Sequence, residues 1–242
     1  MNIWIHGISG RIGKELEAAI ASQPELHLLG GSCNVSPLKE LITSANLIID
    51  FSTPDANRQL LEFLQKAKIK NTSILLCTTG LPSELLDQWR EFSHYNKVLS
   101  APNTSFGMST FTQTLVNFTK SLKNSNSYFD IEIIESHHKN KIDTPSGTAL
   151  SIAQKIQAEL PHFKIIHKHE GKRQQNTIAI HSIRGGGIFG EHTVKFIGDH
   201  EEINFQHKAF SRQVFVTGAL MLAEVLLKKQ QQGFYTVFDL LV

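Results

Sequence analysis

Several features that mark whole classes of protein are scarce in these 242 residues. Two cysteines, Cys33 and Cys77, are too few for the disulfide framework of a small secreted domain. There is no run of about 18 apolar residues, so we expect no membrane span, and a strand pattern begins at once without a signal peptide. The 24 Lys and Arg nearly balance the 22 Asp and Glu, and no long basic run indicates nucleic-acid binding. We therefore expect a cytoplasmic protein without nucleic-acid or membrane partners.

The first residues combine a strand, a glycine triplet and a helix. A short apolar strand at 2–6 is followed by Gly7, Gly10 and Gly13, and an amphipathic helix is expected from about 11 to 22. In this context the first glycine permits a tight turn. The second lets the backbone approach a pyrophosphate, and the third allows close helix–strand packing. The pattern favours a dinucleotide-binding site over a plain tight turn.

Strand and helix patterns then alternate through the first half of the chain. We expect strands at 26–32, 46–51, 73–77 and 97–101, a short helix or turn at 38–44, and helices at 52–68 and 82–95. This order predicts an α/β fold with a Rossmann-type doubly wound parallel sheet, which binds ligands beyond the carboxyl ends of its strands.

The pattern changes after Gly107. A helix at 108–123 and a polar connector precede strand-like runs at 128–136, 163–169, 177–183, 192–197 and 203–209, with only one helix, 148–160, between them. This favours an α+β domain with a mixed open sheet. A periodic helix at 211–229 is expected to return to the first domain, with a terminal helix or turn at 234–240. The predicted domains are thus 1–106 completed by 211–242, for dinucleotide binding, and 107–210, for substrate binding and oligomerisation.

The connection from 135 to 149 concentrates titratable side chains. His137, His138 and Lys141 can exchange protons near neutral pH. The helix start at Ser146-Gly147-Thr148 offers backbone N–H groups to a carboxylate or phosphate. Ordinary helix capping explains Ser146 equally well. Because no cysteine or carboxylate stands nearby at ligand spacing, we predict no metal.

The stretch reads Glu-x-His-His-x-x-Lys-x-Asp-x-Pro-Ser-Gly-Thr-Ala and resembles, without a gap, the signature of the dihydrodipicolinate reductases of lysine and diaminopimelate biosynthesis. The resemblance implies NAD(P)H-dependent reduction of a cyclic dicarboxylate, 4-hydroxy-tetrahydrodipicolinate, to tetrahydrodipicolinate, with hydride added at ring C4 and a proton at the adjacent carbon. It implies that His137 is the proton donor and Lys141 the catalytic lysine, and that the chain forms a homotetramer. The implied substrate-carboxylate contacts are His138, Gly147 and Thr148.

The glycine triplet and the resemblance together predict a set of cofactor contacts. These are Gly7, Ile8, Ser9, Gly10, Arg11, Ile12, Asn34, Cys77, Thr78, Thr79, Ala101, Pro102, Asn103 and Thr104. Cys77 and Thr104 depart from the family pattern, which usually has Gly and Phe there. Asn34 stands where an acidic residue commonly contacts the ribose, and neither a repelling charge nor a firm phosphate clamp is evident. We therefore expect both NADPH and NADH to be used.

Two other functions stay open from the sequence. Another two-domain NAD(P)-dependent dehydrogenase is possible, although an acyl-forming enzyme would need a nucleophilic cysteine in the second domain. A nucleotide-sensing binding protein would keep the glycine triplet but would have no need of His137 and Lys141. A further question is whether His137 and His138 both face one site, since adjacent strand residues point to opposite faces.

Overall fold

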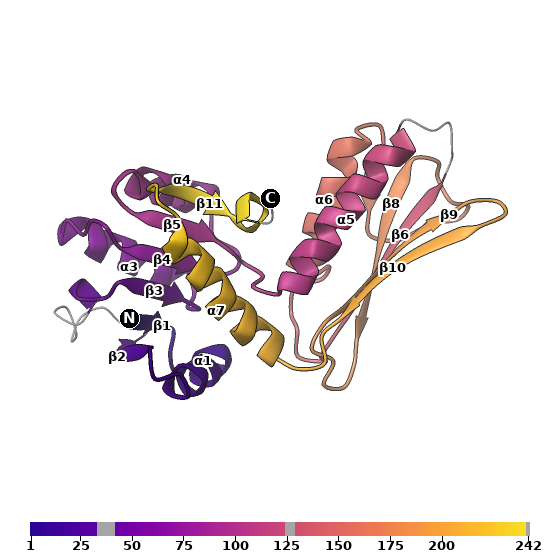
Figure 1. Ribbon diagram of the computed structural model, residues 1–242. Coiled ribbons are helices and arrows are strands. Elements are labelled where there is room, and N and C mark those ends of the chain that lie inside the picture. Colours follow the sequence, from indigo (N-terminus) through magenta and orange to yellow (C-terminus); the bar gives the residue numbers. More distant parts are fainter. Residues whose placement is uncertain (33–41, 124–128, 241–242) are drawn as a thin grey trace. The chain divides into compact units, whose positions relative to one another are not determined.

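The computed structural model describes residues 1–32, 42–123 and 129–240 of the chain. The chain divides into two compact units, Met1–Ser105 with Gln213–Val242, and Phe106–Arg212 (Figure 1). These bounds lie close to those expected from the sequence. The short helix or turn expected at 38–44 lies largely outside the described residues, as do Asn34 and the start of the strand expected from Tyr128.

The first unit contains a six-stranded parallel sheet in the order β11-β5-β4-β3-β1-β2. The prediction of a Rossmann-type sheet is confirmed. The strands are β1 (Asn2–His6), β2 (His27–Ser32), β3 (Leu47–Asp50), β4 (Ser73–Leu76), β5 (Lys97–Ser100) and β11 (Gly233–Thr236).

The sixth strand corrects the expectation of a terminal helix or turn at 234–240. Gly233–Thr236 pairs in parallel with β5, and only Val237–Leu240 forms a short 3-10 helix, η2. As a strand, Gly233–Thr236 provides hydrogen-bond partners for the N–H and C=O groups along the outer edge of β5. If the same four residues were helical, these groups of β5 would lack partners. The sequence pattern of so short a segment does not distinguish these outcomes.

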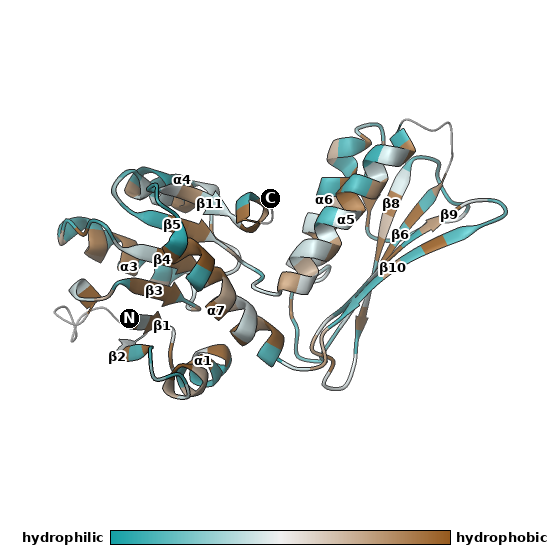
Figure 2. Ribbon diagram, viewed as in Figure 1, coloured by the Kyte–Doolittle hydropathy of each residue, from teal (hydrophilic) through white to brown (hydrophobic). Residues whose placement is uncertain are grey.

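Helices cover both faces of this sheet. Helices α1 (Arg11–Ala21) and α7 (Gln213–Lys228) pack over one face, where their apolar side chains form one core with Ile3 and Ile5 of β1. On the other face lie α3 (Pro54–Lys66) and α4 (Ser83–Phe92), the latter followed by the 3-10 turn η1 (Ser93–Tyr95). Trp4 points into this second core, as the alternation along β1 requires. Figure 2 shows the strands between these helices as mostly hydrophobic, which is typical of a parallel sheet buried on both faces.

The second unit contains a five-stranded mixed sheet in the order β10-β9-β6-β8-β7. Pairs β6/β8 and β7/β8 are parallel, whereas β6/β9 and β9/β10 are antiparallel, which confirms the predicted mixed sheet. The strands are β6 (Asp130–His137), β7 (Lys164–Ile166), β8 (Thr177–Arg184), β9 (Glu191–Ile197) and β10 (Glu202–Lys208). The run expected at 163–169 is shorter in the structure, because residues 167–176 form bends and loops.

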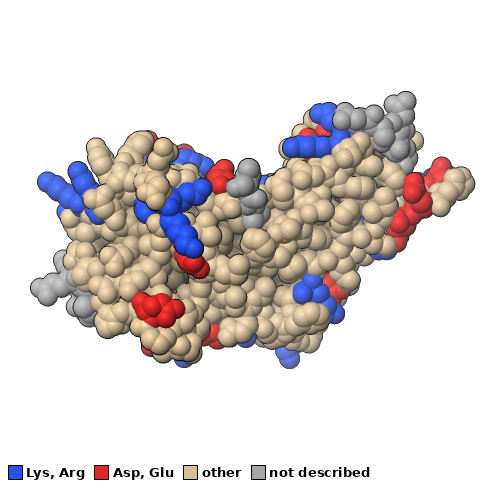
Figure 3. All heavy atoms as spheres, viewed as in Figure 1, with Lys and Arg blue, Asp and Glu red and all other residues tan. Residues whose placement is uncertain are grey.

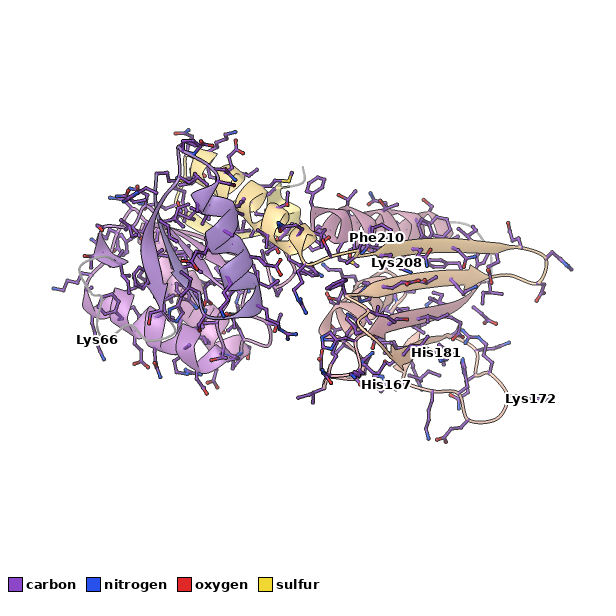
Figure 4. All side chains as sticks on the ribbon, turned by 90° about the horizontal axis from the view of Figure 1, so that it is seen from below. Lys66, His167, Lys172, His181, Lys208 and Phe210 are labelled. Carbon is purple, nitrogen blue, oxygen red and sulfur yellow. The ribbon has the colours of Figure 1, made fainter. Side chains whose placement is uncertain are left out.

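Both helices of the second unit, α5 (Phe106–Lys123) and α6 (Gly147–Glu159), contribute to one core with the sheet. Ile131 and Ile133 of β6 point into that core, and Glu135, two residues further along the same face, is also fully buried. The opposite face of the sheet carries polar side chains such as Glu132 and His181, the latter labelled in Figure 4 on the side away from α5. Glu135 is thus a buried carboxylate at a position of β6 where the alternation predicts an apolar residue, and such an exception indicates a functional site.

No helix in the described parts of the chain is both long and apolar enough to cross a membrane. The face shown in Figure 3 has Lys and Arg interspersed with Asp and Glu, in keeping with the near balance of 24 basic and 22 acidic residues.

Candidate active site

The histidine-rich connection joins the end of β6 to the start of α6. His137 is the last residue of β6, and Gly147 is the first of α6. Ser146 caps the helix, because its Oγ accepts a hydrogen bond from the backbone N–H of Ala149 at 3.2 Å. Because β6 has ended before His138, strand alternation no longer forces His138 to the face opposite His137.

His137 is tied to the buried carboxylate of Glu135. The His137 Nδ1 atom lies 2.5 Å from Glu135 Oε2, and Glu135 is 0% exposed. Arg184 forms a bidentate ion pair with the same carboxylate: Nη1 donates to Oε2 at 2.9 Å and Nη2 donates to Oε1 at 2.7 Å. The backbone N–H of Ser146 donates to Oε1 at 3.2 Å.

Strand register explains how these side chains meet. In the parallel pair β6/β8, Glu135 is opposite Ser182 and His137 is opposite Arg184. Residues two apart on a strand share a face, so Glu135, His137 and Arg184 all point to the helix-covered side. The ion pair forms because the end of β8 lies beside the end of β6.

Charge and hydrogen bonds keep Glu135 ionised. Burial alone would raise its pKa, but hydrogen bonds from His137, Arg184 and Ser182 outweigh burial and hold the pKa well below its ordinary value of 4.5. A buried anion of this kind needs its partners, because removal of one leaves an unpaired charge.

The other nitrogen of His137 lies against a glycine. A Cβ atom added to Gly190 would sit 3.3 Å from His137 Nε2, and the φ of Gly190 is +157°. A side chain at position 190 would therefore crowd the Nε2 atom of His137.

A second histidine, His192, lies beside His137. The two rings are edge-to-face with centroids 5.2 Å apart, and His192 Nε2 is 3.4 Å from Ser146 Oγ. His192 is 3% exposed. Burial, followed by the neighbouring charge of His137, lowers the pKa of His192 to about 3. His192 is thus neutral at physiological pH, and the Ser146 hydroxyl can donate to it.

Lys141 is held by an acidic neighbour from its own loop. Its Nζ lies 2.7 Å from Asp143 Oδ1, and the Gly147 N–H donates to Asp143 Oδ2 at 3.4 Å. Partial burial of Asp143 would raise its pKa, but Lys141 lowers it overall through a hydrogen bond and its charge. The guanidinium of Arg184 also donates to the Asp143 carbonyl at 2.7 Å, which ties the loop to the sheet.

The structure thus brings His137, Lys141 and Gly147 into one network. Its central members, Glu135, Arg184, Asp143 and His192, were not among the predicted site residues. A buried position for Glu135 could have been read from the apolar alternation of β6. The role of Arg184 could not, because it depends on the pairing of β6 with β8.

The glycine triplet forms a tight backbone cradle in the first unit. Gly7 has a φ of +91°, and a Cβ there would lie 2.6 Å from the Phe51 carbonyl oxygen. A Cβ on Gly13 would lie 2.4 Å from the Gly7 carbonyl oxygen. Gly10 precedes α1 and provides no capping side chain. This arrangement fits a dinucleotide cofactor, because it presents the helix N-terminus and leaves space for a pyrophosphate.

Several predicted cofactor residues have buried side chains. The Thr78 hydroxyl donates to buried Asp50 at 2.7 Å, and the Thr104 hydroxyl donates to the Phe215 carbonyl at 2.7 Å. Cys77 is 4% exposed, and burial followed by the charge of Asp50 raises the pKa of its thiol. These residues would therefore contact a cofactor through backbone atoms. Among the members of the predicted set that the structure describes, Ser9, Gly10, Arg11, Thr79 and Pro102 are exposed.

One group in the described part of the chain could hold a metal ion. Ligand atoms of Glu132, His169 and His181 lie within 4.8 Å of one another on the polar face of the second sheet. The guanidinium of Arg173 contacts Glu132 Oε1 and lies 3.3 Å from His169 Nε2, so a cation there would meet a positive charge already in place. The absence of a metal stays a prediction.

Comparison with known proteins gives the family. The family described as dihydrodipicolinate reductase, N-terminus, matches residues 1–104, and its C-terminus counterpart matches residues 107–241. The chain belongs to the dihydrodipicolinate reductase family. Membership confirms the resemblance and the prediction of an NAD(P)H-dependent reductase in lysine and diaminopimelate biosynthesis, with a nicotinamide cofactor. It does not support a different dehydrogenase or a nucleotide sensor.

Individual relatives span the whole chain. A 4-hydroxy-tetrahydrodipicolinate reductase of Clostridium novyi (strain NT) is 36% identical over 250 residues, covering 98% of this chain and 96% of the relative. One of Campylobacter jejuni (serotype O:6, strain 81116) is 34% identical and covers 100% and 99%. The dipicolinate-bound dihydrodipicolinate reductase of Paenisporosarcina sp. TG-14 has a similar fold, with a TM-score of 0.71 at 23% identity, covering 98% of this chain and 97% of that chain.

Proposed function

We propose that this dihydrodipicolinate reductase family member reduces the cyclic dicarboxylate 4-hydroxy-tetrahydrodipicolinate to tetrahydrodipicolinate, with His137 as proton donor and Lys141 as the second catalytic residue. The observation that carries the proposal is the network at the end of β6. It holds a histidine with one nitrogen bonded to a carboxylate and the other beside a glycine, next to a lysine and a capped helix start.

The residues of the loop would have separate roles in proton transfer and in substrate binding. His137 would deliver a proton from Nε2 to the substrate carbon beside the one that accepts hydride. Lys141, the Gly147 N–H and the start of α6 suit one substrate carboxylate, since they already bind the carboxylate of Asp143. We propose His138 and Thr148 as further substrate contacts. Among solved structures with this fold, one reductase has dipicolinate bound, which is a dicarboxylate of the expected class.

The first unit would hold the nicotinamide cofactor on its glycine cradle. When bound, the cofactor supplies the hydride. The backbone of Gly7, Gly10 and Gly13 would hold the pyrophosphate, while exposed residues such as Ser9, Arg11 and Thr79 would complete the site. We propose that NADPH and NADH are both used within about tenfold, or ~1.4 kcal/mol. Asn34, on which this expectation rests, lies outside the described residues, and so does Lys39.

Turnover with purified protein tests the reaction. The wild type should oxidise NADPH or NADH only when 4-hydroxy-tetrahydrodipicolinate, generated in situ, is present. His137→Gln and Lys141→Ala should each lower turnover about 10²-fold or more, the usual scale of acid–base catalysis, with cofactor affinity unchanged. Thr148→Val should mainly weaken substrate binding. Exposed residues provide matched controls, His200→Gln and Lys172→Ala, the latter in a loop labelled in Figure 4.

The results separate the parts of the proposal. A wild type without turnover would overturn the reaction, whereas normal turnover in either variant would overturn only that residue's role. A ratio of kcat/KM above about 100-fold between cofactors would refute mixed use. A preference for NADPH would make Lys39 the first residue to mutate.

We also propose a homotetramer assembled through the second unit. Its sheet has two edges, β10 and β7, and among the described residues of the unit both helices pack on one face of it. Open edges and faces of this kind are commonly covered by partners. Sedimentation of the wild type at micromolar concentration should give a tetramer, and a stable monomer would contradict the proposal.

A further inference from the structure

We infer that Glu135 and Arg184 are positioning residues that decide which nitrogen of His137 delivers the proton. The inference rests on the proposed role of His137 and extends it to two residues that the sequence did not place in the site. Three observations carry it: the complete burial of Glu135, its pairing with both His137 and Arg184, and the position of His137 Nε2 beside Gly190, away from Glu135.

The first step concerns the proton on Nδ1. An ionised carboxylate has only acceptor sites, and Arg184 has only donors. Since Arg184 contacts both oxygens of Glu135, the carboxylate stays ionised, and the Nδ1 atom at 2.5 Å must carry a proton in order to bond to it. Neutral His137 is therefore the Nδ1–H tautomer, with a lone pair on Nε2.

The second step concerns the proton that is transferred. The donor form of His137 is the imidazolium, with protons on both nitrogens. When Nε2 gives its proton to the substrate carbon, the electron pair of that N–H bond stays on Nε2, and the ring returns to the Nδ1–H tautomer still bonded to Glu135. The ring need not turn during the reaction, because the Glu135 contact is the same before and after it.

The third step concerns Arg184. Its guanidinium lies opposite His137 in the β6/β8 register and fixes both Glu135 oxygens with a planar fork. Lys has a single ammonium and cannot reproduce two parallel contacts. Arg184 also donates to the Asp143 carbonyl, so it connects the orientation of His137 to the loop that carries Lys141.

The same strand offers a matched control. Glu132 lies on the opposite face of β6 and, like Glu135, pairs with histidine and arginine side chains: His181 at 2.5 Å, His169 at 3.0 Å, and Arg173. Glu132→Gln makes the same chemical change as Glu135→Gln, three residues away and outside the proposed site.

The experiment combines nitrogen-15 NMR of the histidine rings with pH profiles of the whole enzyme. Wild-type His137, identified by loss of its signals in His137→Gln, should show the Nδ1–H tautomer when neutral. In Glu135→Gln the amide can donate to Nδ1, so the tautomer should change to Nε2–H. The kcat should fall about 10- to 100-fold, and its decline at alkaline pH should begin at lower pH, because the imidazolium has lost its anion.

Further readouts separate positioning from folding. KM for the substrate and cofactor affinity should stay within about threefold of wild type in Glu135→Gln. Arg184→Lys should lose kcat about tenfold at constant cofactor affinity, and Glu132→Gln should match the wild type in tautomer and pH profile. A Glu135→Gln enzyme with lower kcat but an unchanged tautomer and pH profile would overturn the inference.

One outcome is decisive even if the Glu135 and Arg184 variants fold poorly. The tautomer of wild-type His137 tests the inference, because neutral His137 with its proton on Nε2 would refute it. If His137→Gln keeps its turnover, the proposed role of His137 fails, whereas the tautomer measured in the wild type still tells whether Glu135 orients the ring.

Discussion

Replacement of the buried His192 should flatten the dependence of stability on pH. The ordinary pKa of this histidine is 6.5 and its folded value is about 3, so the unfolded chain binds a proton between these values that the native chain does not. Stability contributed by the neutral ring is therefore complete above about pH 6.5 and is lost as the pH falls toward 3. Across that whole window the loss is roughly 5 kcal/mol, at about 1.4 kcal/mol per pKa unit.

Only part of that loss is measurable before general acid denaturation begins. Between about pH 7.5 and 5 the same pKa values give about 2 kcal/mol. The His192→Gln variant keeps a polar group near Ser146 but cannot be protonated. Between about pH 7.5 and 5 the unfolding free energy of the wild type should therefore fall by about 2 kcal/mol more than that of His192→Gln. This difference does not depend on the stability of the variant at about pH 7.5.

The assay must report on the second unit. Both tryptophans, Trp4 and Trp89, lie in the first unit, so their fluorescence does not follow the unfolding of β9. Amide hydrogen exchange of β9 peptides, corrected for intrinsic rates, gives the free energy of opening directly. His200→Gln, an exposed residue in the β9–β10 connection, is the control. Parallel pH curves for wild type and His192→Gln would refute a neutral buried His192.

Three further outcomes follow from individual contacts in the structure. Asp143→Asn should bind dipicolinate about two- to fivefold more tightly by calorimetry, because the partly exposed Lys141–Asp143 pair competes with the ligand carboxylate by at most ~1 kcal/mol. Weaker binding would mean that Asp143 positions Lys141 for the ligand. Gly13→Ala should destabilise the first unit by about 1–3 kcal/mol in thermal unfolding followed by tryptophan fluorescence, since its Cβ would lie 2.4 Å from backbone oxygen. Gly10→Ala, with 3.1 Å available, should cost less, and equal losses would contradict this explanation. Asn57→Leu should lower the unfolding free energy of the first unit by about 1–3 kcal/mol in the same measurement. Buried Asp50 would lose the Asn57 amide that donates to it at 2.6 Å, and the Trp89 N–H would lose its acceptor. An unchanged midpoint would show that these groups find other partners.

Much of the fold could be predicted because local signals agreed with it. The glycine triplet between β1 and α1 requires close backbone contacts that the structure shows at Gly7 and Gly13. The apolar run of β3 indicated a strand buried on both faces, and it lies inside the parallel sheet. Helix periodicity gave α6 and α7 to within a few residues, since each buries one clear stripe.

What the sequence could not give depends on pairing between distant segments. Arg184 stood in a glycine-rich stretch that predicts only a turn, and its contact with Glu135 arises from the register of β8 against β6. The β11 strand forms because the edge of β5 is open to it, which no local property of Gly233–Thr236 reveals. Likewise, Thr78 sits at a predicted cofactor strand end, but its hydroxyl is directed to Asp50.

The interrupted path of the first unit has a consequence for how the protein is made. Its sheet needs β11, and one of its cores needs α7, yet both follow the 107 residues from Phe106 to Arg212 that build the second unit. During synthesis the second unit is therefore complete before the first, whose apolar face stays bare until α7 emerges. A nascent chain stalled before Gln213 would expose Ile3, Ile5 and Ile49 to water and to chaperones, whereas the second unit, continuous in sequence, has all its strands by then.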